Sequence, residues 1–322
     1  MSKKVLVTGG TGFIGAALVK KLLEKGYHVR SLDNDSRGSV SKLGKFAKDV
    51  ELVKGDIRES EAVLKAGKGI DEMIHLAYIN GTEFFYSKPE MVLDVAVRGM
   101  INVLDSCKAN QIRNLVLASS SEVYQTPPTI PTDESAPLVV PDVMNPRYSY
   151  GGGKIICELM AINYGRKNFD RVAIFRPHNV YGSDMGFEHV IPQFISRTKK
   201  LIKENPKGVI PFEVQGDGQQ TRAFVYIDDF TDGLMRVVEK GGHLEIYHIG
   251  TNDEISMGSL AEKVVKFFGR ELKLISGPEM SGATLRRMPN ISKLKALGYS
   301  PKVSLDEGLS KTIPWYIENS RS

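Results

Sequence analysis

Short apolar runs alternate with longer amphipathic segments along the first half of the chain. Residues 5–7 form an apolar run that closes in glycines, and residues 13–25 continue with apolar positions at helical spacing up to Gly26. Further strand-like runs cover residues 27–32, 51–53, 71–77, 114–118 and 171–176, with the longest helical patterns at 89–108 and 148–165. This alternation predicts a parallel sheet whose strands are joined by right-handed helical crossovers.

The pattern loosens beyond residue 176. Strand-like pieces at 212–214 and 223–227 alternate with proline and glycine, and helical patterns return at 228–240, 257–268 and 292–297. We therefore predict an α/β fold, a doubly wound parallel sheet with a smaller α/β lobe packed on it. The sheet domain is predicted at residues 1–181, with 215–245 returning to it, and the second lobe at 182–214 and 246–322.

Composition narrows the class of protein. The 322 residues carry a formal net charge of +5 that is spread along the chain, which suits anionic small substrates better than nucleic acid. Cys107 and Cys157 lie in apolar helical patterns, so we expect no disulfide framework. We also expect no secretion signal, no membrane span and no metal site, and hence a cytoplasmic protein.

A glycine-rich segment, Thr8-Gly9-Gly10-Thr11-Gly12-Phe13-Ile14-Gly15, joins the first predicted strand to the first predicted helix. The spacing G-x-x-G-x-x-G lets a backbone turn tightly, approach a pyrophosphate at the helix N-terminus and pack the helix on the strand. The segment therefore predicts a dinucleotide site on a Rossmann-type sheet, formed by Gly9, Thr11, Gly12, Phe13, Ile14 and Gly15.

Polar residues after the next two predicted strands extend this site. Asp33 lies about 20 residues beyond the glycines, where a carboxylate holds the adenosine ribose diol, with Asn34 beside it. A carboxylate there disfavours a 2′-phosphate, so we predict NAD rather than NADP. Arg37 is near enough to meet a phosphate, although we favour a solvated loop arginine. Asp56, which precedes Ile57, either reaches the adenine or caps the next helix.

Tyr150 and Lys154 lie four residues apart in a predicted helix and therefore share one face. A nearby cation lowers the pKa of a phenol by favouring the phenolate. A phenolate beside a nicotinamide can take the proton of a hydroxyl whose carbon gives up hydride. Because Tyr/Lys pairs are common on helix surfaces, this pair alone does not establish such chemistry.

The residues between that pair are Gly151, Gly152 and Gly153. Consecutive glycines cost a helix roughly 1 kcal/mol each relative to alanine. Either the bare backbone faces a cofactor or substrate, or the helix breaks locally. The run 119–122, Ser-Ser-Ser-Glu, follows a predicted strand, and side chains at the carboxyl end of a parallel strand point into the ligand cleft.

Together these segments resemble the extended short-chain dehydrogenase/reductases, specifically the NAD-dependent epimerase/dehydratase group. The resemblance spans essentially the whole chain. Besides the glycine-rich segment, it rests on His75-Leu76-Ala77, on Arg176-Pro177-His178-Asn179-Val180-Tyr181-Gly182, and on residues 119–124, 150–154 and 216–229.

The resemblance implies roles for individual residues. Tyr150 is implied to be the catalytic base, Lys154 to hold the nicotinamide ribose and lower the tyrosine pKa, and Ser120 to bond the oxygen on C4 of a sugar. Glu122 is implied to be a further catalytic residue, and Leu76 and Ala77 to line the cofactor. The implied substrate is a nucleotide-diphosphate sugar, with contacts from Ser121, His178, Asn179, Val190, Gln193, Arg222 and Arg286 or its neighbour Arg287.

Some positions depart from the family pattern. Tyr78 stands where an alanine often follows His-Leu-Ala, close to the expected nicotinamide, and Gln125 stands where a glycine usually follows Tyr124. The 4,6-dehydratases resemble Thr-Asp-Glu at positions 120–122, and Ser121 is a poor substitute for the aspartate that expels a hydroxyl. The UDP-glucuronate decarboxylases resemble Thr-Ser-Glu there, and the 4-epimerases usually lack the glutamate. Glu122 is therefore either a second acid/base or a ligand of a substrate hydroxyl.

The leading hypothesis is a nucleotide-sugar epimerase that acts through a 4-keto intermediate. Decarboxylation of a uronic acid through the same ketone and 4,6-dehydration are the alternatives. A non-enzymatic NAD-binding scaffold or sensor also stays open, although the presence of both Tyr150 and Lys154 argues against it.

The resemblance also implies a homodimer formed by the helices at 89–108 and 149–165. Apolar positions such as Met91, Val95, Ile155 and Leu159 permit it. They equally permit simple packing of these helices on the sheet.

Overall fold

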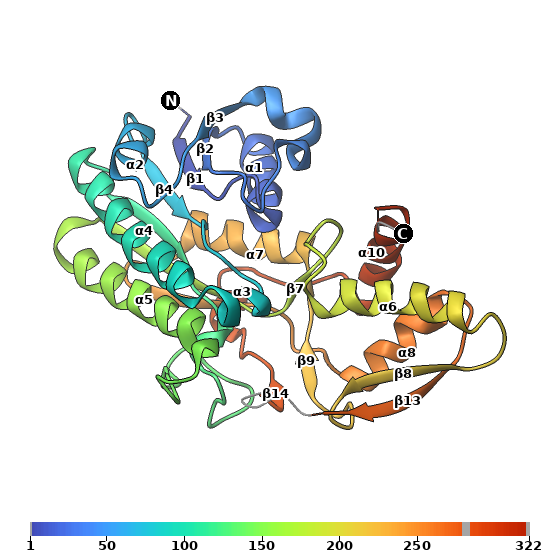
Figure 1. The fold of residues 1–322 in the computed structure, drawn as a ribbon. Coiled ribbons are helices and arrows are strands. Elements are labelled where there is room, and N and C mark those ends of the chain that lie inside the picture. The colour runs from blue at the N-terminus through green and yellow to red at the C-terminus, as the bar shows by residue number, and fades with distance from the viewer. Residues whose placement is uncertain (1, 279–283, 320–322) are drawn as a thin grey trace.

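A seven-stranded sheet forms the centre of the molecule. A computed structural model describes residues 2–278 and 284–319 of the chain (Figure 1). In spatial order the strands are β3 (Val50–Lys54), β2 (His28–Asp33), β1 (Lys4–Thr8), β4 (Glu72–His75), β5 (Asn114–Ala118), β6 (Arg171–Pro177) and β11 (Glu245–Ile249). Every neighbouring pair is parallel, which confirms the predicted doubly wound α/β fold.

Helices cover both faces of this sheet, as the alternation along each strand requires. In β1, Val5 and Val7 pack toward one face and Leu6 toward the other. The first face carries α1 (Phe13–Glu24), α7 (Ile227–Lys240) and the 3₁₀ segment η1 (Val40–Asp49). The second carries α2 (Ser60–Ala66), α4 (Pro89–Ala109) and α5 (Ser149–Asn168), and α4 and α5 lie side by side. Short helical segments at the cleft are α3 (Thr82–Ser87), η2 (Ser121–Val123) and η3 (Pro146–Tyr148).

The second lobe lies beside the carboxyl ends of the strands (Figure 1). Its helices are α6 (Val190–Glu204), α8 (Met257–Phe267), α9 (Ser292–Lys295) and α10 (Leu305–Asn319). Its strands pair as β8 (Ile210–Gln215) with β13 (Leu272–Gly277), β7 (Val180–Tyr181) with β10 (Val225–Tyr226), and β9 (Thr221–Ala223) with β12 (Glu254–Ser256) and β14 (Arg286–Arg287). One apolar cluster runs from the α1/α7 face into this lobe, so the two parts share a core.

Three expectations about boundaries change. Residues 180–181 and 221–226 were expected in the sheet domain, but β7, β9 and β10 form small sheets outside the seven-stranded one. Residues 223–227 were expected to form one strand, but they divide between β9, β10 and the start of α7. Residues 246–249 were expected in the second lobe, but β11 extends the main sheet through them, because Tyr247 and Ile249 are buried and pair in parallel with Phe175 and Pro177 of β6.

Candidate active site

The glycine-rich turn lies where the strand order reverses, between β1 and β4, and this is where doubly wound sheets bind ligands. Gly9 has a φ of 75°, and a Cβ there would lie 2.8 Å from the backbone nitrogen of Ala77. A Cβ on Gly15 would overlap the Gly9 carbonyl oxygen. Leu76 and Ala77 face the same turn, with their amides 3.2 and 3.3 Å from the Thr8 hydroxyl.

The N-terminus of α1 fits a pyrophosphate. Gly12 is the N-cap residue and supplies no side-chain hydrogen bond, and the first turn, which begins with Phe13 and Ile14, contains no acidic residue. The first backbone amides of a helix lack partners within the helix and carry the positive end of its dipole. An anion is therefore the partner that this end of α1 lacks.

Asp33 is held next to this turn. Its carboxylate accepts hydrogen bonds from the backbone amides of Thr11 at 3.0 Å and Asp35 at 2.9 Å. A carboxylate therefore lies beside the predicted phosphate site, at the carboxyl end of β2. Its contact with a ribose stays a prediction.

Asp56 lies beside Asn34, whose amide donates to its carboxylate at 3.0 Å. A hydrogen bond from the Arg58 side chain is the main cause that lowers the pKa of Asp56 to about 2. The alternative of a helix cap is wrong, because the N-cap residue of α2 is Glu59. Ile57 is buried, and contact of Asp56 and Ile57 with an adenine stays a prediction.

Tyr150, at the start of α5, lies among aromatic rings. Its ring stacks on Phe85 of α3 at 4.7 Å between centroids and meets Tyr78 edge-on at 5.2 Å. Burial raises the pKa of Tyr150 to about 12, against a hydrogen bond with Ser120 that lowers it. The expectation of a lowered tyrosine pKa is therefore wrong in this structure, because the aromatic enclosure desolvates the phenolate. Nothing in the sequence pattern singles out Phe85 as a neighbour of Tyr150.

Lys154 is 4% exposed and lies one turn further along α5. Its ammonium donates to the Ala118 carbonyl oxygen at 2.8 Å, at the end of β5, and lies 3.7 Å from the centroid of the Tyr78 ring. Burial lowers the pKa of Lys154 to about 8. Tyr150, Ser120 and Lys154 are thus brought together at the carboxyl end of β5.

The glycines of α5 have a different explanation from either one expected. The helix is continuous over Ser149–Asn168, so a local break is wrong. A Cβ on Gly151 would lie 2.7 Å from the Gln125 side-chain nitrogen, and a Cβ on Gly153 would overlap the Tyr78 phenol oxygen. At these two positions, the bare backbone admits neighbouring protein side chains.

Behind this pair, α5 is tied to the sheet by a buried ion pair. Arg176 of β6 binds both carboxylate oxygens of Glu158, at 2.8 and 2.6 Å. The same guanidinium donates to the Tyr124 phenol, which also bonds His248. Tyr150, Lys154 and Glu158 therefore occupy successive turns of one helix, and Arg176 of the main sheet anchors the middle of that helix.

Glu122 follows Ser121 in η2 and faces arginines. Its carboxylate is 2.5 Å from the Arg287 guanidinium of β14, whose side chain is 8% exposed. Burial opposes the charge of Glu122, but Arg287, Arg147 and Arg222 hold its pKa below the usual value. Arg222 donates to the carbonyl oxygens of Thr221 and Thr284, and burial lowers its pKa to about 10.

Arg286 points elsewhere. Its side chain is 53% exposed and binds Glu254 of β12 at 2.5 Å. Successive residues of a strand point to opposite sides, so only one of these neighbours can reach Glu122. The structure places Arg287 against Glu122 and leaves Arg286 at the surface, against Glu254.

The remaining predicted substrate contacts lie between β6 and β7 and in the first turn of α6. His178 is 1% exposed, and neither ring nitrogen has a hydrogen-bond partner. Asn179 has a φ of 40° and donates to the Ala223 carbonyl oxygen. Val190 begins α6, and Gln193 is exposed with its amide on the Glu188 carbonyl oxygen. A buried imidazole without a partner is a group that a ligand can satisfy.

Arg37 is not a solvated loop residue, as had been favoured. Its guanidinium binds Glu188 at 2.8 Å and lies over the Phe84 ring. Lys42 similarly forms an ion pair with Asp184. Together these two ion pairs, here called the clasp, join the segment after β2 to the segment before α6.

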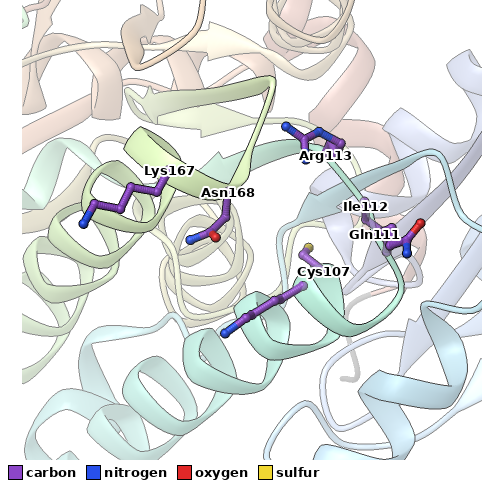
Figure 2. A pocket seen from close by; sticks show the side chains of 7 residues that line it. Cys107, Gln111, Ile112, Arg113, Lys167 and Asn168 are labelled. Atoms are coloured by element: carbon purple, nitrogen blue, oxygen red, sulfur yellow. The ribbon is translucent and has the colours of Figure 1, made fainter.

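A hollow of about 160 Å³ at the other end of the sheet carries no comparable chemistry (Figure 2). Lys108 and Lys167 lie in the last turns of α4 and α5, where the helix dipole favours cations. Arg113 binds Asp170, and burial raises the pKa of the Cys107 thiol to about 12, which makes it a poor nucleophile. Within residues 2–278 and 284–319, no cluster of His, Cys, Asp or Glu is placed to hold a metal ion. No helix in that part of the chain is long and apolar enough to cross a membrane.

Comparison with known proteins gives one consistent family. The profile of the NAD dependent epimerase/dehydratase family matches residues 5–250. A putative UDP-glucose 4-epimerase of Methanocaldococcus jannaschii is 33% identical over 99% of this chain and 100% of its own. UDP-glucuronic acid decarboxylase 1 of Arabidopsis thaliana is 31% identical over 96% of this chain and 69% of its own. A solved dTDP-glucose 4,6-dehydratase of Streptomyces venezuelae with NAD bound superposes with a TM-score of 0.85, at 29% identity, over 98% of this chain and 97% of that one.

The named relatives differ in reaction, whereas the family profile is NAD dependent and the solved dehydratase holds NAD, so the comparisons confirm the implied family and NAD and leave the reaction open. The chain belongs to the NAD-dependent epimerase/dehydratase family.

Proposed function

We propose that this chain is an NAD-dependent nucleotide-sugar epimerase that acts through a 4-keto intermediate. The position of Tyr150 beside Ser120 carries the proposal, because both hydroxyls lie close to the carboxyl end of β5, where Lys154 reaches the Ala118 carbonyl oxygen. A sugar hydroxyl at that point can exchange its proton with Tyr150.

Bound NAD would supply reversible hydride acceptance at the sugar carbon. The protein residues then manage the proton and the charge. Tyr150 would enter oxidation as its phenolate, a state that the positive charge of Lys154 favours, and would take the hydroxyl proton in that state. The resulting phenol would return the proton to the ketone oxygen during reduction, and Ser120 would bond the same oxygen. The aromatic enclosure by Phe85 and Tyr78 keeps water from the phenol.

The substrate would lie between the sheet and the second lobe, which we propose as the nucleotide-sugar lobe. Arg222 and Arg287 provide positive charge on strands of that lobe, and arginine binds phosphate oxygens through charge-assisted bonds. His178, with unpartnered ring nitrogens, offers a hydrogen bond to a sugar or phosphate oxygen. Asn179, Val190 and Gln193 would complete the mouth of this cleft.

Epimerisation is favoured over dehydration by the chemistry around Glu122. Dehydration needs an acid that expels a hydroxyl, but Ser121 is not an acid and Glu122 is held as a carboxylate by Arg287. Decarboxylation of a uronic acid is the second candidate. Arg147, Arg222 and Arg287 lie around Glu122 and offer positive charge for the carboxylate of such a substrate.

The test is to incubate the protein with UDP-, GDP-, CDP- and dTDP-linked sugars and uronates and to follow sugar NMR and reduced-cofactor absorbance. A stable epimer supports the proposal. Carbon dioxide release identifies a decarboxylase, and a 4-keto-6-deoxy product identifies a dehydratase; either would replace epimerisation.

Tyr150→Phe separates an enzyme from a scaffold. Turnover should fall by roughly 10²- to 10⁴-fold, because proton transfer is lost while the cofactor site stays intact. Tyr164→Phe is the matched control, since Tyr164 lies on the same helix but is 40% exposed. No turnover of any sugar, with intact NAD binding, would favour the scaffold.

We further propose a homodimer through the outer face of α4 and α5. Leu93 and Ile101 of α4 and Ile156 and Leu159 of α5 are 38%, 40%, 39% and 58% exposed. Val95, by contrast, packs in the core. If this face pairs with its copy, Leu159→Glu should convert a dimer into a monomer in sedimentation equilibrium; a wild-type monomer would contradict the proposal.

A further inference from the structure

Tyr78 touches both members of the Tyr150/Lys154 pair. It lies in the segment between β4 and α3, and its ring is partly buried against α5. The Lys154 ammonium is 3.7 Å from its ring centroid, and the Tyr150 ring stands at 85° to it. Its phenol oxygen lies 3.4 Å from the Tyr150 carbonyl oxygen, to which it donates.

The helix is shaped to receive this ring. A Cβ at position 153 would overlap the Tyr78 phenol oxygen and lie 2.9 Å from the Ala96 Cβ. Tyr78 can therefore occupy this place only because residue 153 is glycine. The position of the ring depends on a residue that costs helix stability, so packing alone is a poor reason for it.

The surroundings of Lys154 leave its charge weakly compensated. On its own helix, burial raises the pKa of Cys157 to about 11, and Glu158 is engaged by Arg176. On β4, burial lowers the pKa of His75 to about 3, so it is neutral near pH 7. Tyr150 is likewise neutral, with a pKa of about 12. The Ala118 carbonyl oxygen and the face of the Tyr78 ring are thus the close contacts that favour an ammonium, together with the charge of Glu158.

We propose that Tyr78 is a positioning residue: the face of its ring holds the Lys154 ammonium beside Tyr150. A cation is attracted to the negative face of an aromatic ring, and the attraction grows when both are removed from water. The ring thereby fixes the ammonium in place and keeps it protonated. This inference rests on the proposed function, in which Lys154 acts as a cation.

A ring that stabilises the ammonium raises the pKa of Lys154 above the value that burial alone would give. Weakening the face of the ring should lower that pKa, so Lys154 loses its proton at lower pH. A cation–π contribution typical of buried sites corresponds to a shift of roughly 0.5 to 1.5 pH units.

The experiment compares rings of equal size. Tyr78→Phe keeps the aromatic face and removes the phenol oxygen, whereas a trifluorinated phenylalanine at position 78 keeps the size and depletes the face of its electrons. Phe85→Leu is the control, because Phe85 stacks on Tyr150, whereas the Lys154 ammonium lies over the ring of Tyr78. All variants are made in the full chain, and thermal unfolding verifies that each folds.

The readout is the titration of Lys154 followed by NMR of protein labelled at the lysine ε-carbons. The signal is assigned by its loss in Lys154→Met. The midpoint should stay at the wild-type value in Tyr78→Phe and in Phe85→Leu, and should fall by roughly 0.5 to 1.5 pH units in the fluorinated variant. An unchanged midpoint in the fluorinated variant, or an equal fall in Phe85→Leu, overturns the inference.

Turnover distinguishes this inference from the function beneath it. If a nucleotide sugar is converted, the alkaline limb of the pH–rate profile should move down by the same amount in the fluorinated variant. If no sugar is converted but the NMR midpoint falls, the proposed function fails and the contact between Tyr78 and Lys154 stands. If sugars are converted and neither quantity moves, the role of Tyr78 fails alone.

Discussion

Glu122 and its partner Arg287 show how one strand position decides a residue's role. Arg287 is buried against Glu122, whereas its neighbour Arg286 is exposed and binds Glu254. Burial opposes the charge of Glu122, but the arginines hold its pKa below the ordinary value. A depressed carboxyl pKa stabilises the fold above the ordinary pKa, and this stability is lost as the pH falls through the folded-state value.

Glu122→Gln should therefore lower the free energy of unfolding by roughly 1–3 kcal/mol at pH 7, because it leaves Arg287 without its charged partner. The difference from wild type should shrink as the pH falls below the ordinary carboxyl pKa of about 4.3. Urea unfolding at neutral and acidic pH measures both.

Glu254→Gln is the matched control, because the arginine partner of Glu254 is 53% exposed whereas Arg287 is 8% exposed, and it should cost less than about 1 kcal/mol. Equal losses from the two variants would show that the burial of Arg287 has no energetic consequence.

At the scale of single residues, the sequence identified the candidate catalytic residues but not the side chains that pack against them. Tyr150, Lys154 and Ser120 were singled out because the segments around them resemble motifs of a known family, and their catalytic roles stay predictions. The sequence could not decide between Arg286 and Arg287, because a strand of two residues is too short to show an alternation of buried and exposed positions. Phe85 was missed because a ring in a short helix looks like any other apolar residue.

Helix α5 accommodates two side chains from distant segments. Gly151 admits Gln125, which itself has a φ of 54° where a glycine is usual in the family, and Gly153 admits Tyr78. Each of the two departures from the family pattern, Gln125 and Tyr78, therefore packs against one glycine of α5. The sequence signalled an unusual helix, but the partners lie too far along the chain for spacing to reveal them.

The glycines should respond differently to alanine. A Cβ at position 152 would meet only Val140, at an ordinary 3.5 Å, so Gly152→Ala should raise the free energy of unfolding by about 0.5–1 kcal/mol. Gly153→Ala should instead lower it, because Tyr78 and Ala96 must move.

Thermal and urea unfolding of the two variants test this pair. A matching gain in both would mean that Tyr78 leaves its place at no cost.

Across the whole molecule, the clasp formed by Arg37–Glu188 and Lys42–Asp184 joins the predicted cofactor segment to the second lobe. The overall architecture was predictable because strand and helix periodicities are local. The clasp was not, since its partners are separated by 151 and 142 positions and both arginine and lysine are common in loops.

Removing the clasp should speed the loss of NAD. Partly exposed ion pairs contribute about 0.2–1 kcal/mol each, so Arg37→Gln with Lys42→Gln should raise the NAD dissociation rate by roughly 2- to 30-fold. High salt should bring wild type toward the double variant, because it screens such pairs. Stopped-flow release into excess competitor gives the rate.

Lys263→Gln, which breaks an exposed pair with Asp306 in the second lobe, is the control. Release that is insensitive to both salt and the double variant would show that the clasp does not retain the cofactor.

The anchoring of α5 by Glu158 and Arg176 has a consequence for how such chains diversify. Tyr150, Lys154 and the anchor belong to α5 and the main sheet, whereas Arg222 and Arg287 belong to strands of the second lobe. In the proposed function, the residues that carry the redox step and those that bind the substrate thus come from separate pieces of the chain. Replacing the second lobe with that of a relative should change which sugar nucleotide the protein accepts. Tyr150 and Lys154 would keep their positions, because α5 is not replaced.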